Sequence, residues 1–275
     1  MPEAAPNRAT AKAWPTEALG CELAALWPGL QVQVVAETDS TNTRLIERVR
    51  AGDTGACLLV AERQTAGRGR LGRAWHSQGD ASLVFSLGLA LAPASWSGLS
   101  LAVGVALAEA LHPKVLLKWP NDLWLAGESA VNRKLGGILI ETLPRPDAPA
   151  GGKLRHAVVG VGLNLDAPPH SAGLAQAAGW RELEPAASAP ELLARLAAPL
   201  LRALLQFERD GFSAFAERFA ARDALRGQPV RTSGGTAADV TSGRADGVDA
   251  HGALRVRTER GLCLVSSAEV SVHPC

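Results

Sequence analysis

The sequence predicts an α+β protein in which a large domain is followed by a small β-barrel. Apolar segments of strand length alternate with helical patterns as far as residue 225, and after Arg226 the chain changes to short, closely spaced β segments with glycine at the turns. A length of 275 residues suits one large domain, or one domain plus a small one. We therefore divide the chain into an Ala/Pro-rich tail (1–30), in which a short helix is expected near residues 22–26, a main domain (31–225) and the barrel (226–275).

Within the main domain, the type of periodicity separates the strands from the helices. Strands are expected at residues 30–36, 56–64, 82–90, 115–119, 134–142 and 156–165. Helices are expected at 41–51, 96–111, 191–212 and 213–223. Asp39 or Ser40 can cap the first of these helices and Gly52 can end it, whereas Pro199 is expected to kink or split the third.

Composition and charge argue against several classes of protein. The net charge is +1 at pH 7, whereas a nucleic-acid binder usually has a general excess of basic residues. The four cysteines are widely scattered, without the close pairs of metal or redox motifs, and a disulfide framework is not expected in a chain this long. The N-terminus lacks the apolar core of a signal peptide, and no stretch reaches the length of a membrane span. We expect a reduced, soluble, cytoplasmic protein.

The segment TAGRGRLGRA, residues 65–74, places arginine directly after glycine three times. Glycine lets backbone N–H groups approach an anion closely, and arginine supplies planar, permanently charged donors for carboxylate or phosphate. Gln64 precedes the segment and Trp75 follows it, so the loop could close over a small anionic ligand. On its own the segment could equally be a basic turn or a nucleic-acid patch.

Two segments downstream of this loop contain lysines that could bind an anion. In KWPND, residues 118–122, a strand ends at Lys118, and Pro120 forces a turn before Asn121 and Asp122. Lysine can neutralise phosphate and aspartate can hold Mg²⁺, although Pro-Asn-Asp is also ordinary turn chemistry. Lys134 opens KLGGILIE, where paired glycines inside an apolar strand usually mark a close approach by ligand or backbone.

Two polar segments complete the set of candidates. DSTN, residues 39–42, carries hydroxyl groups that can cap a helix or bind a neutral polar ring. Asn164 lies at the end of the apolar strand that ends in GLNL, where a buried amide needs hydrogen-bond partners.

In their order, DSTN, ERQTAGRGRLGRAWHS, KWPNDLWL, KLGGILIE and VVGVGLNL resemble the motifs of the biotin protein ligases. The resemblance is close over residues 36–166 and looser beyond. It implies a mixed-sheet catalytic domain of the class II synthetase-like, biotin–lipoate ligase fold at 31–225, which binds biotin and ATP, and a C-terminal barrel of the SH3-like type. The implied reaction forms biotinyl-5′-AMP and then transfers biotin to a lysine of a biotin carboxyl carrier domain, with Mg²⁺ serving the nucleotide.

Site residues follow from the resemblance, motif by motif. The catalytic set that it implies is Arg70, Lys118, Asp122 and Lys134, with Arg70 retaining the mixed anhydride and Asp122 a candidate Mg²⁺ ligand. Biotin and its adenylate are expected to contact Ser40, Thr41, Asn42, Gln64, Gly67, Arg68, Gly69, Arg70, Arg73, Trp75, Lys134, Gly137 and Asn164. The glycine-rich loop is expected to be mobile until the ligand anion orders it.

The chain departs from the family pattern in two places. Gln78 follows Ser77, where the family often has proline, and His273 stands near the place where some members offer an arginine to the nucleotide. The second departure weakens any role of the barrel in ATP binding. Thirty residues before the first strand are too few for a DNA-binding head, so we expect a ligase without a repressor arm.

Three rival functions remain to be weighed. Lipoyl or octanoyl transferases share the fold by resemblance but do not use the GRGRLGR loop. A non-catalytic biotin sensor could lose Lys118, Asp122 or Lys134, yet all three are present. A nucleic-acid protein would need a second basic cluster, which the sequence does not show. The sequence leaves the oligomeric state, monomer or homodimer, and the acceptor carboxylases open.

Overall fold

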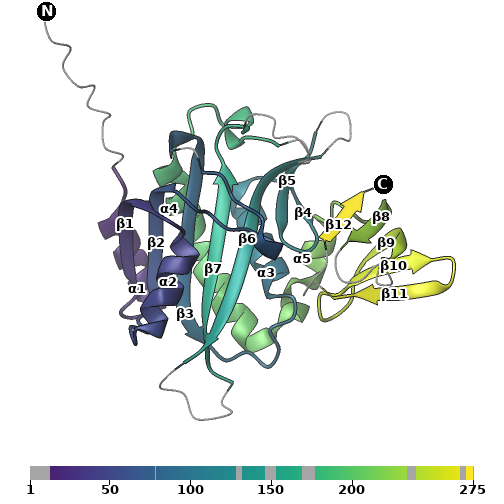
Figure 1. The fold of residues 1–275 in the computed structure, drawn as a ribbon, viewed down its shortest axis with the longest axis horizontal. Coiled ribbons are helices and arrows are strands. Elements are labelled where there is room, and N and C mark those ends of the chain that lie inside the picture. The colour runs from purple at the N-terminus through teal and green to yellow at the C-terminus, as the bar shows by residue number, and fades with distance from the viewer. Residues whose placement is uncertain are drawn as a thin grey trace, which may run out of the picture.

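The computed structural model describes residues 13–77, 79–127, 132–145, 153–168, 177–233, 240–266 and 271–274. A seven-stranded mixed sheet forms its centre, in the order β1-β2-β3-β7-β6-β5-β4 (Figure 1). Its strands are β1 (Gln31–Thr38), β2 (Cys57–Gln64), β3 (Ser82–Leu91), β4 (Val115–Lys118), β5 (Asp122–Leu125), β6 (Arg133–Pro144) and β7 (Arg155–Asn164). Only the β1–β2 pair is parallel among these neighbours, which confirms the expected mixed sheet.

Helices pack against both faces of this sheet, with more of them on one face than on the other. The amphipathic helix α2 (Thr41–Arg50) lies alone on one face, where Leu45 and Ile46 pack on Cys57 and Leu59. The opposite face carries the main core, formed with α1 (Thr16–Leu26), α3 (Leu99–Leu111), α4 (Ala189–Asp210) and α5 (Ala216–Ala220). Short 3-10 turns η1 (Arg70–Gly72), η2 (Gly79–Ala81), η3 (Trp180–Glu182) and η4 (Phe212–Phe215) connect these elements.

Helix α1 corrects the prediction of a tail over residues 1–30. Its residues Leu19 and Leu23 are 2% and 1% exposed and belong to the main core. The sequence shows only part of this helix because three of its seven apolar residues are alanines, which give little amphipathic contrast. From Thr16 onward the predicted tail is therefore part of the packed domain, and residues 1–12 lie outside the described part of the chain.

Two other elements differ from expectation. Strand β5 follows the KWPND turn directly and pairs with β4 as a hairpin, although no strand was predicted at its four residues. Helix α4 continues through Pro199 over 22 residues, so the proline does not split it. Ser188 caps α4, accepting a hydrogen bond from the backbone of Glu191 while the Glu191 carboxylate accepts one from Ser188.

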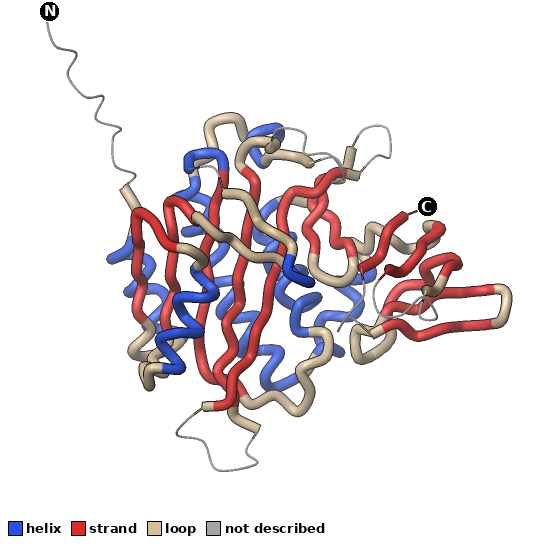
Figure 2. The backbone as a smooth tube through the Cα atoms, viewed as in Figure 1, coloured by secondary structure: helices blue, strands red, loops and turns tan. Residues whose placement is uncertain are grey.

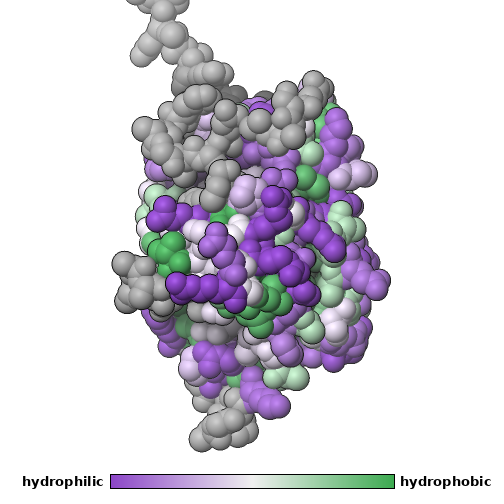
Figure 3. Space-filling model, turned by 90° about the vertical axis from the view of Figure 1, so that its right-hand side faces the viewer, coloured by the Kyte–Doolittle hydropathy of each residue, from purple (hydrophilic) through white to green (hydrophobic). Residues whose placement is uncertain are grey.

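A second, five-stranded antiparallel sheet follows the main domain, in the order β11-β10-β9-β8-β12 (Figure 2). It consists of β8 (Pro229–Ser233), β9 (Ser242–Val248), β10 (Leu254–Thr258), β11 (Gly261–Val265) and β12 (Ser271–Pro274). The backbone of His273 pairs with Arg231, while its side chain lies outside the described part. On this side of the molecule, hydrophobic areas are interspersed among hydrophilic ones (Figure 3).

The two sheets are joined by a buried hydrogen bond. Trp119, in the KWPND turn, is 1% exposed and its indole Nε1 donates to the carbonyl oxygen of Gly252 at 3.0 Å. Gly252 has a φ of +81°, and a Cβ there would lie 2.9 Å from the Cα of Gly98. Glycine is therefore required where the small sheet meets the KWPND turn.

Candidate functional site

One cavity of about 550 Å³ lies against β6 and β7, beneath the glycine-rich loop. Strands β2, β6 and β7, the start of α2 and the β4–β5 turn supply its walls. It is lined by fourteen of the fifteen predicted contact and catalytic residues, all except Gly67: Ser40, Thr41, Asn42, Gln64, Arg68, Gly69, Arg70, Arg73, Trp75, Lys118, Asp122, Lys134, Gly137 and Asn164. Segments separated by more than 100 residues thus meet at one site.

One end of the cavity is polar but built from neutral groups. Ser40 caps α2, accepting from the backbone N–H of Thr43 at 3.4 Å, so the expected capping role is present. Gln64 Oε1 accepts from the backbone N–H of Thr41 at 2.8 Å and lies 3.1 Å from Thr41 Oγ1. This pairing holds the first turn of α2 against the end of β2, with both side chains facing the cavity.

Asn42 fixes the floor beside this end. Its Nδ2 donates to the carbonyl oxygen of Leu139 at 3.2 Å and to Glu141 Oε2 at 2.9 Å. Ser86 Oγ lies 2.6 Å from both Asn42 Oδ1 and Thr41 Oγ1. Because a serine hydroxyl has one proton, the consistent arrangement has Ser86 donating to Asn42 and Thr41 donating to Ser86. Gly160 beneath Asn42 leaves no space for a side chain.

The glycine-rich loop forms a small hairpin over the cavity. Backbone hydrogen bonds join Trp75 N–H to Gly67 O at 2.8 Å and Gly69 N–H to Arg73 O at 2.7 Å. At its tip, Leu71 has a φ of +56° and a side chain open to solvent. Gly67 lies outside the cavity lining, yet a Cβ there would lie 2.7 Å from Gln64 Nε2, so this position needs glycine.

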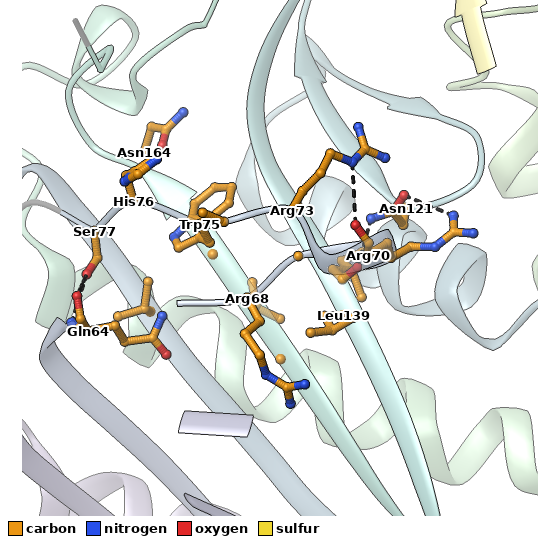
Figure 4. A pocket seen from close by; sticks show the side chains of 18 of the residues that line it. Gln64, Arg68, Arg70, Arg73, Trp75, His76, Ser77, Asn121, Leu139 and Asn164 are labelled. Atoms are coloured by element: carbon orange, nitrogen blue, oxygen red, sulfur yellow. Dashed lines mark hydrogen bonds between the residues drawn. The ribbon is translucent and has the colours of Figure 1, made fainter. Parts of the chain in front are cut away.

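The three loop arginines point to different places (Figure 4). Arg68 Nη2 lies 3.0 and 2.9 Å from the two carboxylate oxygens of Glu141 on β6. Arg70 Nη1 donates to Asn121 Oδ1 at 3.3 Å, beside the β4–β5 turn. Arg73 Nε donates to the carbonyl oxygen of Arg70 at 3.4 Å. Burial and the neighbouring Arg73 lower the pKa of Arg70, so an anion placed here would relieve charge repulsion.

The other end of the cavity is cationic. Lys134 Nζ lies 2.8 Å from Asp122 Oδ1, and Lys118 Nζ lies 3.8 Å from Asp122 Oδ2. Lys118 also sits 5.2 Å above the ring of Trp124. Burial is the largest cause that lowers the pKa of Lys118, and Lys134 and Arg73 lower it further, against the opposing effect of Asp122. Two lysines share one carboxylate, so this end carries uncompensated positive charge.

The expected Mg²⁺ ligand does not fit a metal site in this arrangement. Mg²⁺ is usually held by one or two carboxylates together with substrate phosphates. Asp122 already contacts two ammonium groups, which repel a dication, and the described residues contain no cluster of three or more His, Cys, Asp or Glu side chains placed for a metal. A metal here would be held mainly by phosphate oxygens.

Trp75 and Asn164 frame the remaining wall. The Trp75 ring packs against Gly162, where a Cβ would lie 2.5 Å from it, and its buried Nε1 has no hydrogen-bond partner among the described residues. Asn164 Nδ2 donates to the carbonyl oxygens of Ala178 at 3.2 Å and Lys134 at 3.4 Å. Asn164 therefore supports the backbone of Lys134 as well as lining the cavity.

Sequence reasoning missed three residues of this network. Ser86 is 0% exposed inside the apolar strand SLVFSLGLA, and a serine at such a position is a signal that could have been used. Glu141 ends KLGGILIE, where nothing in the sequence indicates its two partners, Arg68 and Asn42. Asn121 was treated as a turn residue, but its Nδ2 donates to Ile138 O at 2.9 Å and its Oδ1 meets Arg70.

Comparison with known protein families identifies the class of protein to which the chain belongs. Residues 34–164 match the family described as the biotin/lipoate A/B protein ligase family, and residues 227–272 match the biotin protein ligase C-terminal domain. The fold and the site thus define a ligase of the biotin and lipoate class. The C-terminal match and the relatives below narrow this further, and the chain belongs to the biotin protein ligase family.

Individual relatives support this assignment. The chain is 37% identical to the bifunctional ligase/repressor BirA of Salmonella typhimurium over 254 residues, covering 88% of this chain and 74% of that protein. It is 31% identical to the biotin–[acetyl-CoA-carboxylase] ligase of Paracoccus denitrificans over 255 residues, covering 86% and 98%. The structure resembles the biotin protein ligase from Aquifex aeolicus in complex with biotin and ATP, with a TM-score of 0.71, 28% identity and coverage of 89% and 99%.

Proposed function

We propose that the protein activates biotin with ATP to give biotinyl-5′-AMP and pyrophosphate, and then transfers the biotinyl group to a lysine. The observation that carries this proposal is the single cavity with a neutral polar end at Thr41 and Gln64 and a cationic end at Lys118 and Lys134. Biotin has an uncharged polar ring that forms hydrogen bonds, and a carboxylate that must come close to the α-phosphate of ATP. The two ends match these two requirements.

In the first step, a carboxylate oxygen of biotin bonds to the α-phosphorus of ATP, and the bond from that phosphorus to the bridging oxygen of the β-phosphate breaks. The carboxylate is ionised at neutral pH, so this step needs no general base. It needs cations around crowded negative charge. We assign this role to Lys134, Lys118 and Arg70, with Asp122 holding both lysines in place. Mg²⁺ supplied with the nucleotide would neutralise the phosphates.

In the second step, the amine of an acceptor lysine attacks the acyl carbon, AMP leaves and the amine loses a proton. We propose that the acceptor is a biotin carboxyl carrier domain of a carboxylase, in keeping with the printed name of the Paracoccus denitrificans relative. Because ATP is the co-substrate, we place the reaction in the cytoplasm. Among the described residues no helix is long and apolar enough to cross a membrane.

The rival functions are less well supported. The C-terminal domain match and the biotin-ligase relatives favour biotin over lipoate as substrate. A biotin sensor has no need for the cationic end, where Lys118, Lys134 and Arg70 converge. A nucleic-acid binder is disfavoured by the net charge of +1.

Biotin-dependent exchange of pyrophosphate into ATP tests the first step, and mass spectrometry of a carrier domain incubated with protein, ATP, Mg²⁺ and biotin tests the second. Exchange with biotin but not with lipoate, together with a biotinyl adduct on one lysine, is expected. Tight biotin binding without exchange would support the sensor instead. Absence of exchange, together with transfer of an already activated lipoyl or octanoyl group, would support the transferase alternative.

A further inference from the structure

Glu141 connects the glycine-rich loop to the floor of the cavity. Its two carboxylate oxygens lie 3.0 and 2.9 Å from Arg68 Nη2, and its Oε2 also accepts from Asn42 Nδ2 at 2.9 Å. The side chain of Glu141 is 28% exposed and that of Arg68 is 44% exposed. One carboxylate on β6 thus binds a residue of the loop and a residue that starts α2.

This contact extends into a continuous chain of hydrogen bonds. From Thr41 it passes through Ser86 to Asn42, then to Glu141 and finally to Arg68. Ser86 and Asn42 are 0% and 3% exposed, so the middle of the chain is protected from water. Hydrogen bonds in such surroundings are stronger and more directional than those at a surface. The position of the loop is therefore linked to the orientation of the buried floor.

The contact also separates the roles of the loop arginines. Arg68 already faces a carboxylate of the sheet, whereas Arg70 reaches toward the cationic end, where Asn121 and the lysines lie. A guanidinium engaged by a carboxylate is a poor ligand for a second anion unless the first bond breaks. The loop therefore has one arginine suited to anchoring and another suited to the ligand.

We propose that Glu141 is a positioning residue, which seats the loop over the cavity by binding Arg68 and thereby slows escape of the activated biotin. This inference rests on the proposed function. Arg68 is then a loop anchor and not a ligand for the phosphate. Because the pair is partly exposed, its attraction is reduced by salt, and the retention that depends on it is reduced too.

The first test uses Glu141→Gln, which keeps an oxygen for Asn42 but removes the charge that attracts Arg68. We expect biotinyl-AMP to dissociate roughly five to ten times faster, because a charge-assisted bond becomes a neutral one. The maximum rate of pyrophosphate exchange should change less than twofold, since the catalytic cations are untouched. In limited proteolysis with biotin and ATP present, cleavage within residues 65–74 should become faster than in the unmodified protein.

Glu109→Gln is the matched control. Glu109 forms a similar pair with Arg218, 2.9 Å from Arg218 Nε, away from the cavity and with comparable side-chain exposure. This variant should retain adenylate and protect the loop like the unmodified protein. Thermal unfolding of both variants checks that any difference lies in the loop and not in overall stability.

A double-mutant cycle with Arg68→Gln tests the coupling directly. Each single change should speed adenylate release by a similar factor, and the double variant should be no faster than the faster single variant. Raising the salt concentration from 0.05 to 0.5 M should speed release from the unmodified protein but not from Glu141→Gln. Arg68→Lys, which keeps the charge, should restore part of the retention.

Several results would overturn the inference. One is retention and loop protection in Glu141→Gln equal to those of Glu109→Gln. Another is multiplication of the two single effects in the double variant. A third is faster release with an unchanged proteolysis pattern, which would assign Glu141 to the floor through Asn42 alone. If the unmodified protein shows no pyrophosphate exchange, the proposed function itself has failed.

Discussion

Asp122 and Lys134 lie twelve positions apart in the sequence, and their side chains meet at 2.8 Å across the β5–β6 pair. Asp122 also contacts Lys118 at 3.8 Å from the adjacent strand β4. A single carboxylate therefore sets the spacing of two ammonium groups that would otherwise repel each other. This arrangement explains why a motif that ends in aspartate can serve a site that binds phosphate.

Replacing Asp122 by asparagine removes that shared counter-charge. We expect the rate of biotin-dependent pyrophosphate exchange to fall about ten- to hundredfold, because charge-assisted hydrogen bonds contribute roughly 1.5–3 kcal/mol. Asp166→Asn, which weakens the pair with Arg181 outside the cavity, is the control and should leave exchange unchanged. Equal rates in the two variants would show that Asp122 does not organise the lysines.

Arg70→Gly should release activated biotin into solution. The arginine reaches over the cavity toward Asn121, and glycine removes the cation without adding bulk. We expect faster dissociation of biotinyl-AMP and labelling of lysines on bystander proteins, detected with a biotin-binding probe. Arg63→Gln, an exposed residue paired with Glu37, serves as the control. Unchanged adenylate dissociation in Arg70→Gly would refute the retention role.

Gly162→Ala should displace Trp75 from the wall of the cavity. The new Cβ would lie 2.5 Å from the indole ring, and overpacking of this kind costs about 1–3 kcal/mol. If Trp75 supports the adenylate, KM for ATP should rise roughly tenfold, with a smaller change in kcat. Gly20→Ala, whose Cβ meets nothing within 4 Å, is the matched control. A lowered unfolding temperature with unchanged KM would leave Trp75 a purely structural role.

The alkaline limb of the pH profile should report Lys118. Burial lowers its pKa, so the cation needed at the phosphate end is lost at a lower pH than for a lysine in water. Exchange should therefore fall as the pH rises toward the usual lysine range, and Lys118→Arg should move that limb upward because arginine stays charged.

The free energy of unfolding should depend on pH in the direction opposite to that of the activity. Between the lowered pKa of folded Lys118 and that of an unfolded lysine, the unfolded chain holds the extra proton. The free energy of unfolding should therefore rise with pH in this interval, relative to Lys118→Arg. If activity and stability instead fell together, Lys118 would not be the group responsible.

The sequence predicted most of the sheet because its strands are long and apolar. Strand β5 was missed because four residues directly after a turn give too little periodicity to detect. Only the end of helix α1, near residues 22–26, was anticipated, because its alanines weaken the amphipathic pattern. Both elements depend on tertiary partners: β4 and β6 pair with the strand, and α4 and β1 pack against the helix.

The order of the motifs was enough to identify the residues that line the cavity, although the roles of these residues stay predictions. The pairings could not be foreseen, since the contact of Arg68 with Glu141 spans 73 positions. For the same reason the sequence does not reveal that two lysines converge on Asp122, an arrangement that argues against the suggested metal role.

The hydrogen bond from Trp119 to Gly252 makes the small C-terminal sheet a structural neighbour of the reaction centre. Trp119 lies directly after Lys118 and two positions before Asn121, so separating the two parts would leave a buried donor unsatisfied beside both residues. A fragment ending near residue 225 would therefore be an impaired enzyme and not an independent one. A C-terminal sheet grafted from a relative should therefore require a glycine at that turn, where a Cβ would lie 2.9 Å from the Cα of Gly98.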